Sequence, residues 1–551
     1  MKFREENRVF KDPRRVDLRI CIVYPNEYKA GVSTLAVQIL YFLFNSFENV
    51  YCERFFYEKG GEPLSIETKT PLKEFDVLAF TLHYELDYPR AIAALIDSGV
   101  NVKGEMRGPD EPIVIAGGPA VTQNPLPLKP FFDAFFIGEV EEEGIRLLEA
   151  LLESRLRSLE EKRRILDPLT KVRGLYVPSI MDNVKVERVY VKNLDHAFYP
   201  IRQVIPLDEE QSLFGPAFYL EIGRGCGWGC RFCLSGYIYR PPRFRSLTRI
   251  FEILRLVPGF NKHVKRVVLI SFAAGDHPNF KEILNKIIEE GYELSIPSLR
   301  ADVLDAEALG YIIEGGQKTL TIAPEVGTMR LAKMINKKLY PEYIKTLAKT
   351  AFKEGVKKIK LYFMIGLPTE TIEDVKEIGE LINYISSIGF SKINVSVTPF
   401  IPKPHTPLQW EGMQDIGVIK EKYEILAETL KSRGRVELKI FNPEVALIEG
   451  AVSKGDNRLS EVILRVALAG RFGLQAWRKA FSEAGLRPEY YAGRRIPLDE
   501  KLPWSFIDTG VREDFLKKEY ERFFLEEESP ACYSMCSGCM TRCYLRARGA
   551  R

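Results

Sequence analysis

The sequence predicts an α/β protein of three domains. Continuous apolar strands alternate with helical patterns over residues 15–150, which indicates a Rossmann-like, doubly wound parallel sheet. Six further strands, each followed by a helix, indicate a partial (β/α)6 barrel over residues 215–435. Residues 436–551 are helical and charged and end in a cluster of cysteines. Residues 151–214 are expected to be a linker and extended segment.

The first domain is expected to hold strands at 18–25, 50–57, 76–82, 112–118 and 134–139, with a helix at 33–45. Ligands of open α/β sheets bind at the carboxyl ends of the strands. Small or polar residues stand at those ends: Pro25, Asn26, Gly31, Gly117, Gly118, Pro119, Gly138 and Glu139.

The barrel, of the TIM type, is expected to use strands at 217–221, 266–276, 293–302, 318–327, 357–368 and 392–402. Reactive groups of such barrels lie at the carboxyl ends of the strands, which is where the polar residues of this segment fall.

Composition excludes some classes of protein. A formal net charge of +4 over 551 residues favours neither nucleic acid nor an anionic membrane as partner. No apolar run reaches the roughly 18 residues of a membrane span, and the charged first residues are not typical of a secretory signal. Seven of the nine cysteines fall in two tight clusters, which suits metal binding in a reducing cytoplasm rather than disulfides.

The stretch that follows the first barrel strand is the strongest signal of chemistry. Cys226, Cys230 and Cys233 have C-x3-C-x2-C spacing in a glycine-rich loop. Three thiolates can hold three irons of a cubane and leave the fourth iron open for a small molecule. Alternatives are a zinc knuckle, which would want a nearby fourth ligand, and a ferredoxin-type carrier, which would have C-x2-C-x2-C spacing.

This loop resembles that of radical S-adenosylmethionine (SAM) enzymes, with Phe232 as the aromatic residue before the last cysteine. The resemblance implies that a [4Fe-4S] cluster on Cys226, Cys230 and Cys233 binds SAM. Reductive cleavage of SAM would then give a 5'-deoxyadenosyl radical, with ferredoxin or flavodoxin as the reductant.

The resemblance also implies SAM contacts after successive strands. Gly275 and Asp276 would meet the methionyl amine, and Ser298 and Arg300 the SAM carboxylate, where a guanidinium can donate two parallel hydrogen bonds. Glu325 would reach the ribose or the amine. Ile365 and Gly366 would shape the adenine pocket.

The first domain resembles the cobalamin-binding domain that precedes many radical SAM barrels. The D-x-H-x-x-G signature of that domain is absent here. The domain could bind cobalamin without a lower-axial histidine. Alternatively it could be a vestigial or substrate-recognising domain, and this alternative is slightly favoured. The segments PKPHTPLQW, KGDNRL and LPWSFIDTGV resemble one group of radical SAM proteins with such a cobalamin-binding-like first domain.

A proline-rich loop after the sixth strand carries His405, Gln409 and Trp410. Prolines stiffen an extended loop. The loop could line a substrate pocket, with His405 preferred over His277 as a polar contact, or it could cap the barrel with Trp410 as a core anchor.

The chain ends with Cys532, Cys536, Cys539 and Cys543 in C-x3-C-x2-C-x3-C spacing. Four thiolates can close a second [4Fe-4S] site, which is favoured, or a tetrahedral zinc site. The arginines around the last cysteine could contact RNA phosphates or be solvated: Arg542, Arg546, Arg548 and Arg551.

The sequence therefore predicts a radical SAM enzyme that modifies an RNA, a protein or a small molecule. Methylation is expected if cobalamin binds, and sulfur insertion, methylthiolation or rearrangement if it does not. Two alternatives are an iron-sulfur electron-transfer protein that no longer cleaves SAM and an RNA-binding module with a zinc-stapled tail.

Overall fold

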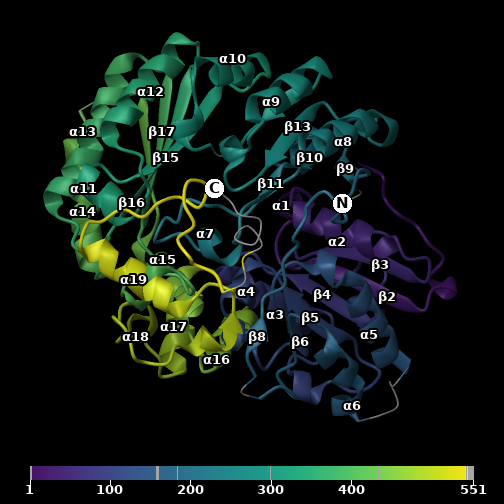
Figure 1. Cartoon of the computed structure of the whole chain (residues 1–551). Coiled ribbons are helices and arrows are strands. Elements are labelled where there is room, and N and C mark those ends of the chain that lie inside the picture. The colour runs from purple at the N-terminus through teal and green to yellow at the C-terminus, as the bar shows by residue number, and fades with distance from the viewer. Residues whose placement is uncertain are drawn as a thin grey trace.

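The computed structural model describes residues 3–156, 161–182, 184–297, 299–431, 434–541 and 543. Its first unit is a six-stranded sheet with the order β3-β2-β4-β5-β6-β7, shown in purple and blue in Figure 1. Every predicted strand of this unit is present. The strands are β2 (Leu18–Tyr24), β3 (Val50–Phe56), β4 (Val77–Thr81), β5 (Ile113–Gly117), β6 (Ala134–Phe136) and β7 (Leu175–Tyr176).

All ladders of this sheet are parallel except the last, in which β7 runs antiparallel to β6. The strand order reverses between β2 and β4, and such a reversal marks the ligand crevice of doubly wound sheets. β7 lies within residues 151–214, so this segment completes the sheet as well as linking two domains.

Helices cover both faces of the sheet because alternate strand residues point to opposite sides. Leu18, Ile20 and Ile22 share a core with α2 (Leu35–Asn45) and α5 (Gly144–Leu156). Cys21 and Val23 face the other side, where α3 (Tyr88–Asp97) packs.

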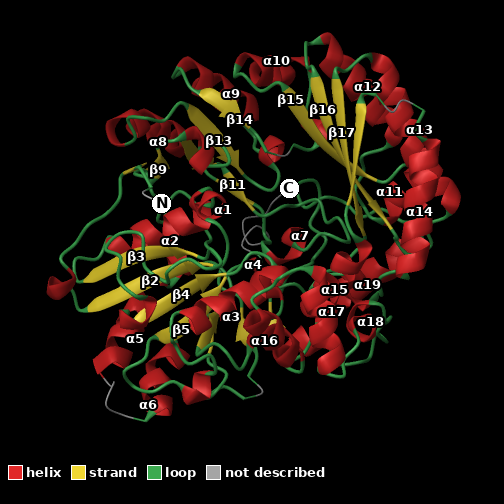
Figure 2. Cartoon of the chain, turned by 180° about the vertical axis from the view of Figure 1, so that it is seen from behind, coloured by secondary structure: helices red, strands yellow, loops and turns green. Residues whose placement is uncertain are grey.

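The second unit consists of two parallel sheets that form a partial barrel (Figure 2). The first contains β10 (Ala217–Glu221), β13 (Arg266–Ile270) and β14 (Glu293–Ser295); the second contains β15 (Thr319–Glu325), β16 (Lys358–Ile365), β17 (Lys392–Pro399) and β18 (Val436–Ile440). No ladder joins β14 to β15 among the described residues. The six predicted strands are present, and β18 is a seventh that the predicted boundary at residue 435 left outside.

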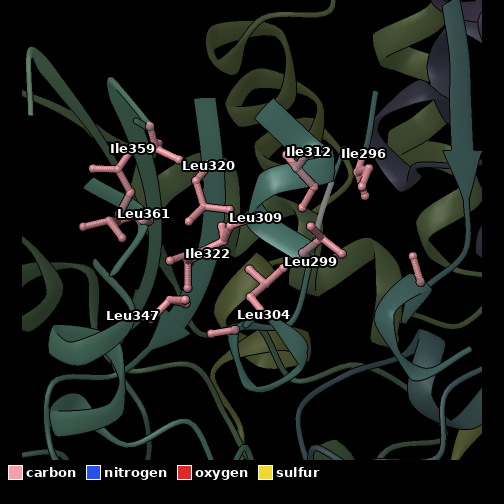
Figure 3. Close-up of a cluster of buried hydrophobic side chains, with 14 of the residues drawn as sticks. Ile296, Leu299, Leu304, Leu309, Ile312, Leu320, Ile322, Leu347, Ile359 and Leu361 are labelled. Carbon is pink, nitrogen blue, oxygen red and sulfur yellow. The ribbon is translucent and has the colours of Figure 1, made fainter. Parts of the chain in front are cut away.

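Helices on the outside of these sheets bury apolar side chains against the strands. They are α8 (Leu247–Phe260), α9 (Phe280–Glu289), α10 (Ala306–Glu314), α12 (Pro341–Lys353), α13 (Ile372–Ile388) and α14 (Ile416–Thr429). Figure 3 shows part of this core, in which Leu309 and Ile312 of α10 lie near Leu320 and Ile322 of β15. The core fixes the strands, and with them the loops at their carboxyl ends.

The C-terminal helices lie against both the first unit and the barrel. They are α15 (Pro443–Lys454), α16 (Leu459–Ala469), α17 (Leu474–Glu483), α18 (Pro488–Ala492) and α19 (Glu513–Phe524). Val462, Ile463 and Val466 of α16 belong to the same apolar cluster as Ala91 and Leu95 of α3, and Figures 1 and 2 show these two helices side by side. β8 (Val186–Glu187) also pairs with β19 (Ile507–Asp508). The helical segment therefore shares a core with the first unit. No helix within the described ranges has the length and apolar character needed to cross a membrane.

Candidate cluster site and cofactor cavity

The cluster loop, residues 225–234, leaves the carboxyl end of β10 and turns back through two left-handed glycines. Gly225 has φ +84° and Gly229 φ +74°. A Cβ on Gly225 would lie 2.3 Å from the Tyr239 carbonyl oxygen, so only glycine fits there. The Cys233 amide donates to the Cys230 carbonyl over 3.1 Å. These turns gather the three predicted cysteines in one short loop.

The three thiols share a buried space. Burial raises the pKa of Cys226 to about 12 and that of Cys233 to about 11, and Cys230 adds to both shifts. Thiols bind metals as thiolates, and bound cations supply the charge that burial alone disfavours. The donor set therefore fits an iron-sulfur cluster.

The described side chains offer no three-ligand site for a single metal ion. Within the described ranges, no three His, Cys, Asp or Glu side chains are grouped so that they could hold one metal ion. A cubane differs from zinc because its ligands bind separate irons at separate corners.

Arg300 and Asp276, two predicted SAM contacts, hold the cluster loop through Trp228. The Arg300 guanidinium lies 3.8 Å from the centre of the Trp228 ring. Its Nε and Nη2 each donate to Asp302 over 3.0 Å. The Trp228 indole nitrogen donates to Asp276 over 2.6 Å. Both side chains lie after the strands where the sequence places them, and here they bond to other side chains of the protein. Their contact with SAM stays a prediction.

Glu325 lies at the end of β15, after a register shift in its pairing with β16, and has φ +70°. A non-glycine residue in this region is strained, and such strain gathers at functional sites. Glu325 accepts from the Lys337 ammonium over 2.9 Å. Burial disfavours the ammonium, but Glu325 and Cys230 together outweigh burial and raise the pKa of Lys337. The same ammonium lies 5.9 Å from the centre of the Phe232 ring, next to Cys233.

The remaining predicted contacts fall into three cases. A Cβ on Gly275 would lie 2.1 Å from the Val303 side chain, so this turn packs closely. Ile365 is fully buried, while Gly366 has φ +86° and donates its amide to Glu370 over 2.7 Å. Ser298 lies outside the described residues, as do Arg542, Arg546, Arg548 and Arg551.

A cavity of about 420 Å³ separates the carboxyl ends of the first sheet from β10 and β13. One part is an apolar slot between α2 and the sheet; the other is a polar mouth beside the barrel. The slot is lined by residues that include Leu35, Ile39, Phe44, Ala79, Ile115, Phe136 and Leu147, and the mouth by residues that include His83, Gly117, Gly118, Glu139, Glu221, Arg224, Tyr239 and Ser271. It lies where the reversal of strand order predicts a ligand.

Buried ion pairs close one wall of this mouth. Glu139, after β6, accepts from Arg224 over 2.9 Å and from two nitrogens of Arg243 over 2.8 Å each. Burial would raise the pKa of Glu139, but Arg243 and Arg224 outweigh it and lower the pKa to about 2. Arg224 also contacts Glu221 of β10 over 2.8 Å. These ion pairs join the end of β6 in the first sheet to the residues that flank the cluster loop and to β10 of the barrel.

The histidines proposed for substrate contact have structural partners. His405 is 6% exposed, and its Nε2 lies 3.0 Å from the Gln123 carbonyl oxygen. His277 is 4% exposed; its Nε2 lies 2.8 Å from the Arg245 carbonyl oxygen, and its Nδ1 accepts from the Asn279 amide. These bonds favour a structural role for both rings, and their contact with substrate stays a prediction. Trp410 is fully buried, as the core-anchor alternative had it.

The C-terminal cysteines lie beside the cluster loop. Burial raises the pKa of Cys532 to about 11, and Cys536, Cys539 and Cys543 each add to this shift. Arg240 forms a hydrogen bond with Cys539. No pattern in the sequence indicates that this segment lies next to Cys226.

Sequence reasoning missed several side chains of the site. The sequence analysis did not single out Lys337, Tyr533 and His83. It also did not single out Trp228, which stands within the cysteine motif itself. His83 stands two residues after the end of the apolar strand β4, and a polar residue near a strand end is a usable signal in a parallel sheet.

A partial parallel barrel with a three-cysteine loop after its first strand, behind a doubly wound domain, defines an α/β metalloenzyme class. Family models agree: residues 36–178 match "Radical SAM proteins, N-terminal" and residues 220–382 match "Radical SAM superfamily". The chain belongs to the radical SAM superfamily. It is an enzyme whose cofactors are SAM and a [4Fe-4S] cluster.

Known relatives fit this assignment. The uncharacterised protein MJ0966 of Methanocaldococcus jannaschii is 36% identical over 445 residues, which cover 81% of this chain and 90% of that protein. The uncharacterised methyltransferase PH0819 of Pyrococcus horikoshii is 26% identical over 62% of this chain and 70% of its own.

Among solved structures, the radical SAM methyltransferase TsrM of Kitasatospora setae, with cobalamin and a [4Fe-4S] cluster bound, has a similar fold. The TM-score is 0.52 at 12% identity, over 85% of this chain and 99% of TsrM. This likeness confirms the predicted α/β fold.

Proposed function

We propose that this enzyme transfers a methyl group from SAM to its substrate with the help of a bound corrinoid. The observation that carries the proposal is the cavity between the first sheet and the cluster strand. When bound, a corrinoid supplies a cobalt centre that can accept and pass on a methyl group. The methyltransferase name of PH0819 and the cobalamin in TsrM support this choice over a vestigial first domain.

The cavity has the two parts that a corrinoid requires. A flat nucleotide base needs an apolar slot, and the slot between α2 and the sheet is lined by leucine, isoleucine and phenylalanine. The broad ring needs loops that let it come near the backbone. Gly118 has φ +110°, and a Cβ there would lie 2.4 Å from the Leu82 carbonyl oxygen. Position 118 therefore adds no side chain to the mouth.

Among the residues of the mouth, His83 would contact a bound corrinoid. Burial lowers its pKa to about 4, so the imidazole is neutral at ordinary pH. Its Nε2 lies 2.9 Å from the Thr81 hydroxyl, and the described residues offer no recorded partner for Nδ1. A neutral imidazole held through one nitrogen presents the other as a donor to a metal.

On the barrel side, Cys226, Cys230 and Cys233 would hold the SAM cluster. Arg300, Glu325 and Lys337 stand around them as charged groups that can orient the amino acid end of SAM. Buried pairs such as Glu139 with Arg243 would exclude water between the two cofactors.

The four C-terminal cysteines would hold a second metal site, with a [4Fe-4S] cluster preferred to zinc. A ferredoxin or flavodoxin of a reducing cytoplasm would supply electrons. The substrate class, whether RNA, protein or small molecule, is left open by this proposal.

The test is anaerobic reconstitution with iron and sulfide, with and without hydroxocobalamin. Cobalamin retained after gel filtration is measured per chain, and 5'-deoxyadenosine and S-adenosylhomocysteine are measured after SAM and dithionite are added. We expect about one cobalamin per chain, and S-adenosylhomocysteine only when cobalamin is present.

Cys230→Ala is expected to abolish both products. The matched control is Cys21→Ala, which removes a buried thiol of β2 far along the chain from the cluster loop. No retained cobalamin in the wild type would contradict the proposal. Iron bound without any SAM product in the presence of cobalamin would favour an electron-transfer protein instead.

A further inference from the structure

The C-terminal cysteine segment, residues 529–541 and 543, touches the backbone of the cluster loop. The Cys532 amide donates to the Gly227 carbonyl over 2.7 Å. The Gly227 amide in turn donates to the Tyr533 hydroxyl over 3.0 Å. A Cβ on Gly227 would lie 2.8 Å from the Tyr533 ring, so the two segments are in close contact. Gly227 directly follows Cys226, so these bonds act next to a predicted cluster ligand.

The Tyr533 side chain is also tied to the barrel. Its hydroxyl shares a hydrogen bond with Asp276, the residue that accepts from Trp228 of the loop. Its ring lies 6.2 Å from that of Trp228, edge-on, and 6.2 Å from that of Phe244, nearly parallel. Tyr533 therefore joins three elements: the loop, the turn after β13 and its own segment.

A second set of bonds joins the other side of the loop to the start of the cysteine segment. The Asn336 amide nitrogen donates to the carbonyls of Trp228 and Gly229 over 3.2 and 3.3 Å, while its oxygen accepts from the Ser529 amide over 3.0 Å. Arg231, fully buried, donates to Glu519 over 3.0 and 3.1 Å and to the Ser529 hydroxyl over 3.2 Å.

Within the described residues, the segment from Ser529 onward contains no helix and no strand apart from an isolated bridge at Met540. A stretch of this kind cannot hold its shape by a backbone ladder. Metal binding to its four cysteines would supply that order, because metal binding to an otherwise irregular segment is folding free energy.

We infer that the C-terminal cysteine segment positions the SAM cluster loop. Tyr533 is the positioning residue through which metal binding at the four C-terminal cysteines affects that loop. The inference rests on the proposed roles of both cysteine sets. Hydrogen bonding around the sulfurs tunes iron-sulfur clusters, so a shift of the Gly227 amide alters the cluster itself and its SAM complex.

The experiment uses the full chain reconstituted anaerobically. Tyr533→Phe keeps the ring contacts and removes the hydroxyl, and Cys536→Ser removes an exposed ligand of the second site. Tyr490→Phe, at a tyrosine that is 53% exposed, is the matched control. Iron content, the melting temperature and the EPR spectrum of the dithionite-reduced protein are recorded with and without SAM.

We expect Tyr533→Phe to keep the iron content and melting temperature of the wild type. Its SAM-induced EPR change should require about tenfold more SAM, as the loss of one hydrogen bond predicts. Cys536→Ser should show the same loss of SAM response. Tyr490→Phe should match the wild type.

Wild-type SAM responses in both Tyr533→Phe and Cys536→Ser would overturn the inference. If Cys536→Ser does not fold, Tyr533→Phe alone decides. Cys230→Ala distinguishes failure of the proposed function from failure of this inference. If Cys230→Ala retains the SAM-responsive signal, the assignment of the cluster ligands is wrong. A Tyr533 variant without effect refutes only the positioning role.

Discussion

Replacement of Glu139 by Gln tests the buried contact between the first sheet and the two arginines that flank the cluster loop, Arg224 and Arg243. The carboxylate is 6% exposed and bonded to Arg224 and Arg243. Its pKa falls from 4.5, the ordinary value, to about 2, and such a fall corresponds to about 3 kcal/mol of stability. Breaking a buried pair from one side costs about 3–5 kcal/mol. We therefore expect Glu139→Gln to lower the free energy of unfolding by about 3 kcal/mol at pH 7.

The pH dependence identifies the cause. Because the folded pKa of Glu139 is depressed, its contribution is present above about pH 4.5 and is lost as the pH falls through about 2. The wild type and the variant should therefore converge in acid. Urea unfolding followed by tryptophan fluorescence, at several values of pH, measures the difference.

Glu149→Gln, on the exposed side of α5, is the control and should have little effect at any pH. A loss below about 1 kcal/mol at pH 7 for Glu139→Gln, or a loss that does not shrink in acid, would refute the reasoning.

Three further predictions concern the cavity and the loops around it. His83→Ala should weaken cobalamin retention about fivefold and change the EPR spectrum of the bound cob(II)alamin, because one contact to the ring is lost; an unchanged spectrum and affinity would exclude His83 as a contact. Gly118→Ala should lower both the melting temperature and cobalamin occupancy, since its Cβ would lie 2.4 Å from a backbone oxygen at φ +110°; normal occupancy at a normal melting temperature would contradict the fit of the mouth. His405→Gln should lower the melting temperature, yet the folded protein should form 5'-deoxyadenosine within about twofold of the wild type, since its ring bonds to the Gln123 carbonyl; a loss of product at normal stability would restore a role in substrate contact.

Buried strands were predictable because their apolar runs are continuous. β2, β4 and β5 are examples, and each is followed by glycine or polar residues that mark the end of a strand in a parallel sheet. β18 was missed because Val436–Ile440 alternates apolar with charged residues and lies at the edge of its sheet, where exposed side chains weaken the pattern.

The site was predictable where the signal is local in sequence. The three cysteines of the loop and the strand ends at Arg300 and Glu325 are of this kind. The contact between Gly227 and Tyr533 joins residues 306 positions apart, and no periodicity carries such information. The partner of His405 was unpredictable for a similar reason: its ring bonds to the Gln123 carbonyl, 282 residues away, and nothing near it in the sequence shows this.

The packing of α16 against α3 brings the last segment of the chain back onto the first, with the barrel between them in sequence. A fragment that ends at residue 435 would leave the apolar face of α3 exposed, including Ala91 and Leu95, and a fragment that begins at residue 215 would expose Val462 and Val466. Neither piece is expected to be soluble alone. Recombination that exchanges only the barrel between relatives should therefore succeed only when the first and last segments come from the same parent.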